Sequence, residues 1–296
     1  MTLRNIWREQ LDNLIKNVIL TPFNVLYKVD PALTLKTLFR LKQGYPLDLK
    51  DPKTYNEKLQ WVKLNDRAPL MAACCDKYHV REYVKARGLE HILNGLLWEG
   101  FDPAEIPYDT LPDKFVIKVT HGSTFNIICE DASKLDRDEV TKKCRKWLKA
   151  KFIPCYGEWF YGKRRPRVIV EDYIESTDGE ALKDYKVFCF NGKPLLIRVD
   201  TDRFSAHRDT VYDCDWHLIE GAHMGHGCGK AIEKPECLDE LLEYAHILSE
   251  PFRHARVDFY ITDRITFGEI TFTNGAGFDK FSSYEFDRMM GDHFEL

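Results

Sequence analysis

No run of 18 or more apolar residues occurs in this chain of 296 residues, so the sequence predicts no transmembrane helix. The nine cysteines form no CxxC pair and no regular spacing, and their odd number is typical of free thiols in a reducing compartment. A Walker-type GxxxxGK(S/T) loop is absent, as are internal repeats and low-complexity linkers. We therefore expect neither a P-loop nucleotide site nor a repeat architecture.

A strong net charge is also missing. The formal net charge is -4 and the isoelectric point lies near 6.2, so nothing indicates binding to nucleic acid. The first 28 residues are amphipathic and interrupted by charged side chains, so we expect no secretory signal peptide and a cytoplasmic location. With 44% apolar residues the chain can bury a sizeable core, and we expect two or three subdomains.

The N-terminal part of the sequence predicts helices. Residues 3–20 carry an apolar stripe at helical spacing, which usually packs on its own domain and less often lies on a membrane surface or a partner. Pro31–Lys42 and Pro52–Leu64 are expected to form two further short helices. In the second of these, Thr54 and Glu57 have the spacing of a capping box.

A strand, a glycine turn and a second strand are predicted between Phe115 and Cys129. Lys118 lies on the first strand, and the tight turn at His121–Thr124 follows it. A lysine and several backbone N–H groups beside such a turn suit a phosphate. A Gly-Ser pair in a hairpin is, however, more often only a turn, and both interpretations stay open.

Two later β-rich segments also carry charged residues. Val168–Ile174 is a strand of buried type that contains two acids among aliphatic residues. The hairpin that follows turns at Asn191-Gly192, a strong turn signal, and carries Lys186 and Arg198 on its strands.

Two segments rich in basic or histidine side chains have plainer interpretations. The helix expected over Asp138–Lys151 is basic, and we interpret its charges as a solvated face. Ser205–Lys230 holds four histidines and Cys228. The usual zinc spacings are absent there, so zinc binding is not expected.

The most informative stretch is Arg256–Phe278. It predicts a hairpin of Val257–Thr262 and Thr266–Thr273 with a short polar turn between them. Counted back from the turn, Asp258 and Glu269 fall on paired strands, so their carboxylates can converge on one point. Two interpretations are open: a solvated hairpin face, or a site for a hard cation such as Mg²⁺ that keeps positions open for phosphate oxygens.

In their order along the chain, these segments resemble a known family. VIKVTHGST, VIVEDYI and VDFY…FGEITFTNGAG are similar to the motifs of the ATP-grasp fold. DPKTYNEKLQWVKLNDRAPL, DKYHVREYV, DYKVFCFNGKP and RVDFY…GEITF more closely resemble the TupA-like ATP-grasp family, and the resemblance covers residues 45–290. It implies an α+β architecture, the ATP-grasp fold, in which two α+β subdomains clamp ATP.

The resemblance also implies a division of the chain. A helical N-terminal region is expected at 1–70, the N-terminal part of the ATP-grasp core at 71–112, and a lid subdomain at 113–174. The C-terminal subdomain with the metal site is expected at 175–296.

Carried over residue by residue, the resemblance implies a nucleotide site. Lys77 and Lys118 match lysines that contact ATP phosphates, and the His121–Thr124 turn matches the mobile glycine-rich loop above them. Glu171 matches the hinge glutamate that, with backbone groups, reads the adenine amine. The full set implied for ATP binding is Lys77, Lys118, His121, Gly122, Ser123, Thr124, Glu171, Asp172, Tyr173, Ile174 and Asp184.

The same resemblance implies Mg²⁺ ligands and two catalytic cations. Asp258 and Glu269 match the metal ligands. The family's Glu-x-Asn is Glu-Ile-Thr here, so Thr271 takes the third position and Asn274 is a candidate replacement. The cations that would face the γ-phosphate and the acceptor are Lys186 and Arg198.

The implied reaction is an ADP-forming carboxylate–amine ligation through an acyl phosphate. Its setting would be surface-polysaccharide or teichuronopeptide biosynthesis, with a uronic-acid carboxylate and an amine or amino acid as substrates. Peripheral association with a polysaccharide-assembly complex is a further expectation.

Other functions stay open. A phosphotransferase acting on a sugar hydroxyl would need the same nucleotide site. A glycosyltransferase would need acids of the DxD type, for which there are two short matches, Asp200-Thr201-Asp202 and Asp213-Cys214-Asp215. A binding-only protein is disfavoured because both metal acids and both phosphate lysines are present.

Overall fold

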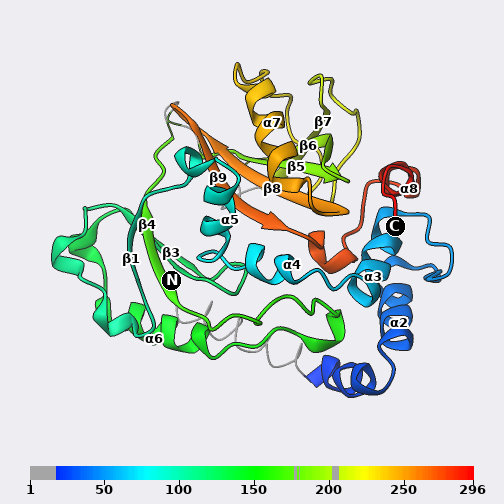
Figure 1. The fold of residues 1–296 in the computed structure, drawn as a ribbon, viewed down its shortest axis with the longest axis horizontal. Helices are drawn as coiled ribbons and strands as arrows, with labels where there is room; N and C mark the ends of the chain where they lie inside the picture. The colour runs from blue at the N-terminus through cyan, green and yellow to red at the C-terminus, as the bar shows by residue number, and fades with distance from the viewer. Residues whose placement is uncertain (1–17, 177–178, 180, 202–206) are drawn as a thin grey trace.

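Two antiparallel sheets and a set of short helices make up the computed structural model of this chain (Figure 1). The structure describes residues 18–176, 179, 181–201 and 207–296. Most of the N-terminal stripe predicted at 3–20 lies outside these described residues. Among the residues described, no helix is both long enough and apolar enough to cross a membrane.

The smaller sheet, sheet A, has four strands in the order β1-β4-β2-β3. Alternate residues of β2, Phe115, Ile117 and Val119, are buried on the face covered by helix α6 (Arg137–Leu148). The opposite face therefore carries Lys118. The strands are β1 (Leu96–Gly100), β2 (Phe115–Val119), β3 (Asn126–Cys129) and β4 (Val168–Asp172).

Strand β1 precedes residue 113, at which the lid subdomain is expected to begin. It pairs antiparallel with β4, with Trp98 opposite Val170. The predicted strand–turn–strand between Phe115 and Cys129 is confirmed as β2 and β3. The subdomain boundaries themselves stay a prediction.

The larger sheet, sheet B, has five strands in the order β7-β6-β5-β8-β9. The turn between β5 and β6 is the predicted one, because Asn191 and Gly192 both have positive φ, 48° and 77°. Gly192 is also required for space, since a Cβ there would lie 2.9 Å from Cα of Glu250. The strands are β5 (Asp184–Phe190), β6 (Lys193–Thr201), β7 (Arg208–Asp213), β8 (His254–Ile261) and β9 (Ile265–Thr271).

Helix α7 (Leu238–Ser249) covers one face of sheet B. Val187 and Cys189 of β5 and Val257 of β8 are fully buried on that side, and the Cys189 Sγ lies 3.8 Å from the carbonyl oxygen of Ala245. Because side chains alternate along a strand, the residues between them point to the other face. That other face carries the charged residues of the site.

The N-terminal helices pack beside sheet B and against the C-terminus (Figure 1). The capping box predicted at Thr54 and Glu57 is confirmed at the start of α3, which packs against α8. Residues 18–29 are helical, and the named helices here are α2 (Pro31–Gln43), α3 (Tyr55–Asn65), α4 (Pro69–Cys74), α5 (Val80–Ala86) and α8 (Tyr284–Asp292). Short 3-10 turns are η1 (Glu90–Ile92), η2 (Pro103–Glu105), η3 (Tyr108–Thr110), η4 (Ala132–Lys134), η5 (Pro154–Tyr156) and η6 (Asn274–Gly277).

Candidate active site

Four charged residues form one row across sheet B. Arg198 of β6 lies opposite Lys186 of β5, Lys186 lies opposite Asp258 of β8, and Asp258 lies opposite Glu269 of β9. Residues opposite one another on antiparallel strands project to the same face. The prediction that Asp258 and Glu269 fall on paired strands is confirmed, Lys186 and Arg198 lie on the same face, and the two pairs are continuous.

Lys186 is the centre of this row. Its Nζ lies 2.7 Å from Oδ2 of Asp258 and 3.8 Å from Oδ2 of Asp200, and it also contacts Asp184. Its side chain is only 5% exposed. A buried ammonium is tolerated only where carboxylates neutralise it, and here three do so.

Arg256 is a site residue that the sequence analysis missed. Its guanidinium donates to both oxygens of Asp258 at 2.7 Å, to Glu269 at 3.2 Å and to the Thr271 hydroxyl at 3.1 Å, and it also contacts Asn274. All four predicted metal ligands therefore contact one arginine. Arg256 precedes Asp258 by two positions on β8, a spacing that places both on one face and could have indicated it.

The charge of this cluster shifts two pKa values. Burial alone would lower the pKa of Arg256, but the carboxylates of Asp258 and Glu269 raise it above its ordinary value. Burial alone would raise the pKa of Glu269, but Lys77, Arg256 and Lys186 hold it well below its usual range. Glu269 is therefore a carboxylate at neutral pH.

The donor set fits a hard cation. Asp258, Glu269, Thr271 and Asn274 all offer oxygen atoms, which Mg²⁺ prefers. A carboxylate has about four lone-pair sites, so the contacts with arginine and lysine leave some free. The Glu269 side chain is 40% exposed and open to an incoming ion, whereas Asp258, at 4%, is enclosed by Arg256 and Lys186.

Lys77 joins the two sheets. Its backbone N–H donates to the carbonyl oxygen of Thr120, directly after β2, at 3.1 Å. Its Nζ lies 3.2 Å from Oε2 of Glu269 on β9. The predicted phosphate lysine thus lies between sheet A and the charged row of sheet B.

Lys118 and Glu171 pair on sheet A. Lys118 Nζ lies 2.6 Å from Oε2 of Glu171. Arg81, which the sequence analysis also missed, places its Nη1 3.1 Å from Oε1. Both oxygens of the predicted hinge glutamate are thus bound by cations. The adjoining hinge backbone is held as well, because the Asn94 amide donates to the carbonyl oxygen of Asp172 at 2.8 Å. The role of Glu171 in reading adenine stays a prediction, as do those of Tyr173 and Ile174.

The predicted phosphate turn, His121–Thr124, has a buried start and an exposed tip. His121 is 4% exposed, and its Nε2 lies 3.0 Å from the carbonyl oxygen of Ala150. Gly122 is required, because a Cβ there would lie 2.2 Å from the Phe125 ring. Ser123 and Thr124 are exposed. Within the described ranges, no hydrogen bond or ion pair links this turn to sheet B, so its place over a phosphate stays a prediction.

Comparison with known proteins decides the family. The sequence model of the TupA-like ATP-grasp family matches residues 57–295. The chain belongs to the TupA-like ATP-grasp family. Among curated proteins no relative matches it.

Several solved structures are similar to this ATP-grasp chain. A D-alanine–D-alanine ligase from Bacillus anthracis, complexed with ATP, is 18% identical with a TM-score of 0.40, over 67% of this chain and 55% of that one. An L-amino acid ligase from Bacillus licheniformis is 15% identical with a TM-score of 0.47, over 75% and 49%. The ATP-grasp ligase PsnB, complexed with a minimal precursor, Mg and ADP, is 12% identical with a TM-score of 0.40, over 74% and 58%. The chain thus spans about half the length of these solved proteins.

At the β6 end of the row, the surroundings of Arg198 in this ATP-grasp chain distinguish a surface pair with a nearby aspartate from a buried residue of the site. Arg198 does contact Asp200, with Nε 3.0 Å from Oδ1, but the side chains are only 6% and 2% exposed. Burial would raise the pKa of Asp200, and Arg198, Lys186 and His207 together lower it. The pair is a buried part of the site and not a surface contact.

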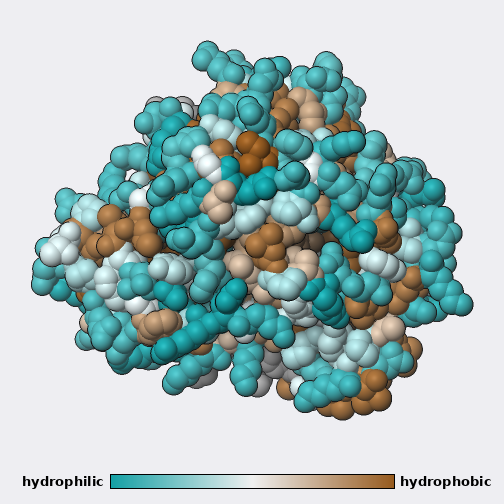
Figure 2. Space-filling model, viewed as in Figure 1, coloured by the Kyte–Doolittle hydropathy of each residue, from teal (hydrophilic) through white to brown (hydrophobic). Residues whose placement is uncertain are grey.

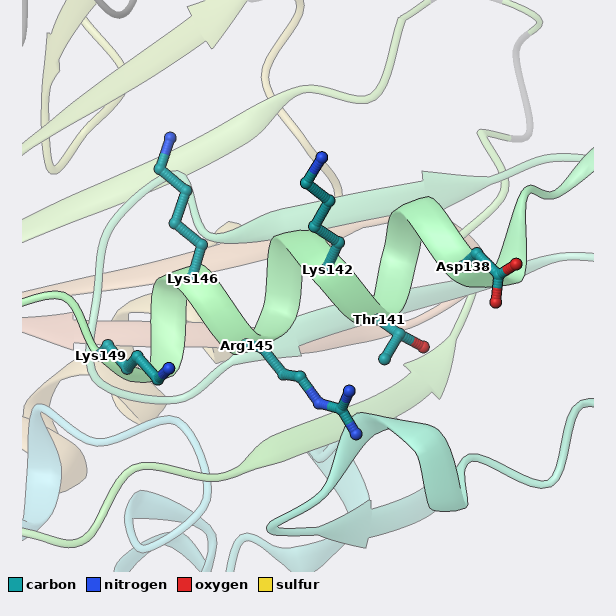
Figure 3. A pocket seen from close by; sticks show the side chains of 6 residues that line it. All are labelled: Asp138, Thr141, Lys142, Arg145, Lys146 and Lys149. Carbon is teal, nitrogen blue, oxygen red and sulfur yellow. The ribbon is translucent and has the colours of Figure 1, made fainter.

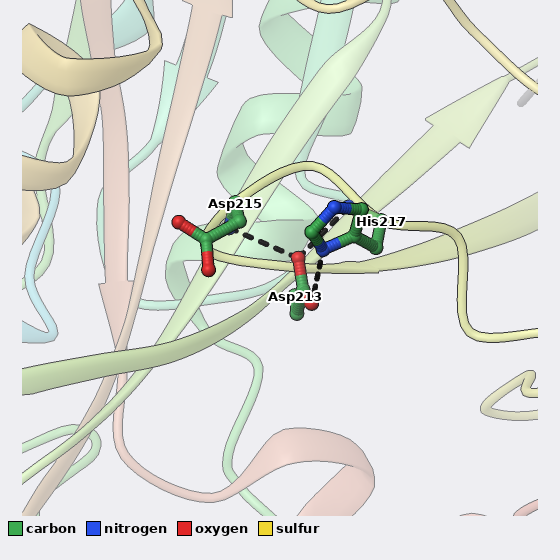
Figure 4. A group of neighbouring side chains, drawn as sticks. All are labelled: Asp213, Asp215 and His217. Atoms are coloured by element: carbon green, nitrogen blue, oxygen red, sulfur yellow. Dashed lines mark hydrogen bonds and ion pairs between the residues drawn. The ribbon is translucent and has the colours of Figure 1, made fainter.

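The two DxD matches have different settings in this TupA-like chain. Asp200 contacts Lys186 and Arg198 of the charged row, and Asp202 lies outside the described residues. Asp213, Asp215 and His217 form an exposed turn (Figure 4). Oδ1 of Asp213 accepts from the backbone N–H groups of the other two at 2.9 and 2.8 Å, and its Oδ2 lies 3.0 Å from the imidazole of His217. These contacts explain the turn without a metal.

Proposed function

We propose that this TupA-like ATP-grasp protein is an ATP-dependent, ADP-forming ligase that joins a carboxylate to an amine through an acyl phosphate. The observation that carries the proposal is the charged row of sheet B, in which Arg198, Lys186, Asp258 and Glu269 lie opposite one another. Phosphoryl transfer requires acids that hold a metal and cations that neutralise the transferring group. This row offers both on one face.

ATP would lie between the two sheets. Lys77 and Lys118 would contact its phosphates, with the His121–Thr124 turn above them, and the Glu171–Ile174 segment would hold the adenine. Lys77 supports this placement, because it contacts Thr120 beside sheet A and Glu269 on sheet B. Asp184 would contribute by holding Lys186 in place.

Mg²⁺ would be held by Glu269 and Asp258, with Thr271 and Asn274 as further oxygen donors. When bound, the ion would neutralise charge on the ATP phosphate oxygens. Arg256 orients the four ligand side chains through the contacts described above. Lys186 faces the γ-phosphate from the neighbouring strand.

The reaction would have two steps. The acceptor carboxylate attacks the γ-phosphorus of ATP, the bond to the β,γ-bridging oxygen breaks, and ADP leaves behind an acyl phosphate. An uncharged amine then attacks the acyl carbon, phosphate leaves, and the amine nitrogen loses a proton. The acceptor class we propose is a uronic-acid carboxylate of surface polysaccharide, in a cytoplasmic reaction.

The test is ADP release with Mg²⁺ and ATP against a panel of uronic acids and uronate-bearing sugar nucleotides, with amino acids as amines. Hydroxylamine traps an acyl phosphate as a hydroxamate, and mass spectrometry detects the amide. ADP release with hydroxamate and amide supports the ligase. ADP release with a phosphorylated sugar and no hydroxamate would establish the phosphotransferase instead.

We expect ATP to bind more tightly than GTP. The Glu171–Ile174 segment offers a carboxylate and backbone carbonyls, which accept from the adenine amine and have no such partner in guanine at that position. Isothermal titration calorimetry with both nucleotides and Mg²⁺ measures the difference. Equal or reversed affinities would contradict the role of Glu171–Ile174 in adenine binding. They would not bear on the charged row of sheet B.

We expect Arg198→Lys to raise the acceptor KM and lower kcat while the Kd of ATP stays unchanged. An arginine forks onto a carboxylate with two hydrogen bonds, and lysine offers only a point charge. Arg208→Lys is the matched control, because Arg208 is exposed on the neighbouring strand β7. If Arg198→Lys and its control have equal kinetics with a working acceptor, the acceptor pocket lies elsewhere.

A further inference from the structure

The helix at residues 18–29 has an apolar face that no other part of the described chain covers. Val18, Val25 and Val29 are 65%, 60% and 81% exposed, and their spacing places them on one side of the helix. The opposite side is in contact with the protein, because Leu20 and Tyr27 pack into the N-terminal core. The helix contains one charged residue, Lys28, and no acid.

Exposed apolar side chains are concentrated in this region. Of the large apolar side chains that are exposed in the described residues, six fall between positions 18 and 41. Figure 2 shows the brown patch at the lower right, over the dark-blue helix of Figure 1. Scattered single exposures are normal on a soluble protein, but a contiguous patch marks an interaction surface. The six are Val18, Ile19, Val25, Val29, Leu33 and Leu41.

A strongly basic segment adjoins the apolar helix. Residues 137–167 hold eleven lysines and arginines against three acids, in a chain whose formal net charge is -4. Lys142 and Lys146 project from one side of α6, one turn apart, with Lys149 at its end (Figure 3). Within the described chain, no carboxylate pairs with these three lysines, whereas Arg145 is paired with Asp102 at 3.0 Å. These three lysines are therefore available to bind an anionic group of another molecule.

The apolar helix and the basic segment are packed together. The backbone N–H of Cys155, seven residues after α6, donates to the Asn24 side chain at 3.0 Å. Ile153 and Cys155 share a core with Leu20 of the helix. Both segments lie along the lower edge of the molecule in Figure 1. The charge and the apolar stripe thus lie on segments that pack together at the same edge of the molecule.

We propose that this surface binds an anionic lipid membrane. The Val18–Val25–Val29 stripe enters the boundary between headgroups and acyl chains, and the lysines of α6 pair with lipid phosphates. Stable peripheral binding takes two signals together, an apolar one and a basic one, and both are present here. A soluble polyanionic glycan would account for the lysines but not for the exposed valines, so a lipid surface is the occupant that fits both.

The test is co-sedimentation of the full chain with vesicles of phosphatidylcholine alone and with added phosphatidylglycerol. We expect binding at least tenfold tighter to the anionic vesicles, and weaker binding as salt is raised. Val25→Ser with Val29→Ser, and separately Lys142→Gln with Lys146→Gln, should each lower the affinity several-fold. Leu218→Ser and Lys193→Gln are matched controls, because Lys193 is exposed on β6 and Leu218 is exposed in the segment after β7, and they should bind like the wild type.

Three vesicle results would overturn the proposal: no sedimentation with either vesicle, equal sedimentation with both, or variants that bind as tightly as the controls. A fourth contrary result is binding of polygalacturonate, a soluble polyanionic glycan, without binding of vesicles. Thermal unfolding of each variant provides a second readout. Because the valines are exposed, their replacement should leave Tm unchanged. A lowered Tm with unchanged vesicle binding would mean that another part of this chain covers the valine stripe, and it would contradict the lipid proposal.

Discussion

Asp258→Asn and Glu269→Gln are each expected to lower Mg²⁺-dependent ADP formation by about 10²–10³-fold, the usual cost of removing one group that stabilises transition-state charge. Each substitution keeps the shape of the side chain and removes its charge. Glu269→Gln is the sharper of the two tests, because the Glu269 side chain is 40% exposed and the buried Arg256 stays paired with Asp258 when Glu269 is neutral. The measurement is a coupled ADP assay over a range of Mg²⁺ concentrations.

Folding has to be separated from chemistry in this test. Asp258→Asn removes the carboxylate that contacts both Arg256 and Lys186, so Tm should fall, whereas Glu269→Gln neutralises a partly exposed carboxylate and should lower Tm less. Asp263→Asn is the control, because Asp263 is exposed at the turn of the same hairpin. A Glu269→Gln protein that is folded and forms ADP at the wild-type rate would show that this acid is no metal ligand.

Arg256→Met is expected to lower the free energy of unfolding by about 3–5 kcal/mol, the typical cost of breaking a buried ion pair by removing one partner. The arginine side chain is 9% exposed, and its loss leaves Asp258 without two of its hydrogen bonds. Unfolding in urea, followed by circular dichroism, measures the change. Catalysis should fall as well, because the predicted metal ligands lose the group that orients them.

Arg253→Met is the matched control for that experiment. Arg253 precedes β8, its side chain is 47% exposed, and its nearest carboxylate, that of Asp66, lies 3.9 Å away. An exposed pair of this kind contributes about 0–1 kcal/mol, so its removal should leave stability almost unchanged. Equal stability of the two variants would contradict the buried network described for Arg256.

Local signals in the sequence predicted the two hairpins but not their full register. Asn191-Gly192 makes the turn between β5 and β6, yet Lys186 lies opposite Arg198 only because the pairing shifts between Phe188 and Cys189. In the second hairpin, a shift between Asp258 and Phe259 likewise places Asp258 opposite Glu269. A one-residue shift changes which residues share a face, and no turn signal specifies it.

The pairing of the two hairpins with each other could not be predicted in this way. Lys186 and Asp258 are 72 positions apart, with α7 between them, and no local turn fixes the register of β5 with β8. Arg81 and Glu171 are 90 positions apart on different elements. Such contacts depend on how sheets and helices pack, so Arg81 was missed as a site residue, whereas Arg256 could have been found from its spacing to Asp258 on β8.

The sequence by itself determined strands β2 to β6, β8 and β9, the turns of the two hairpins and the capped start of α3, because each of these depends on residues a few positions apart. Only the tertiary structure decided that the two hairpins share one sheet, that Lys77 spans 192 positions to reach Glu269, and that one arginine contacts all four predicted metal ligands. The physical reason is that a buried charge pairs with the opposite charge that the folded core places beside it. That proximity is set by packing between distant segments, which no local pattern specifies.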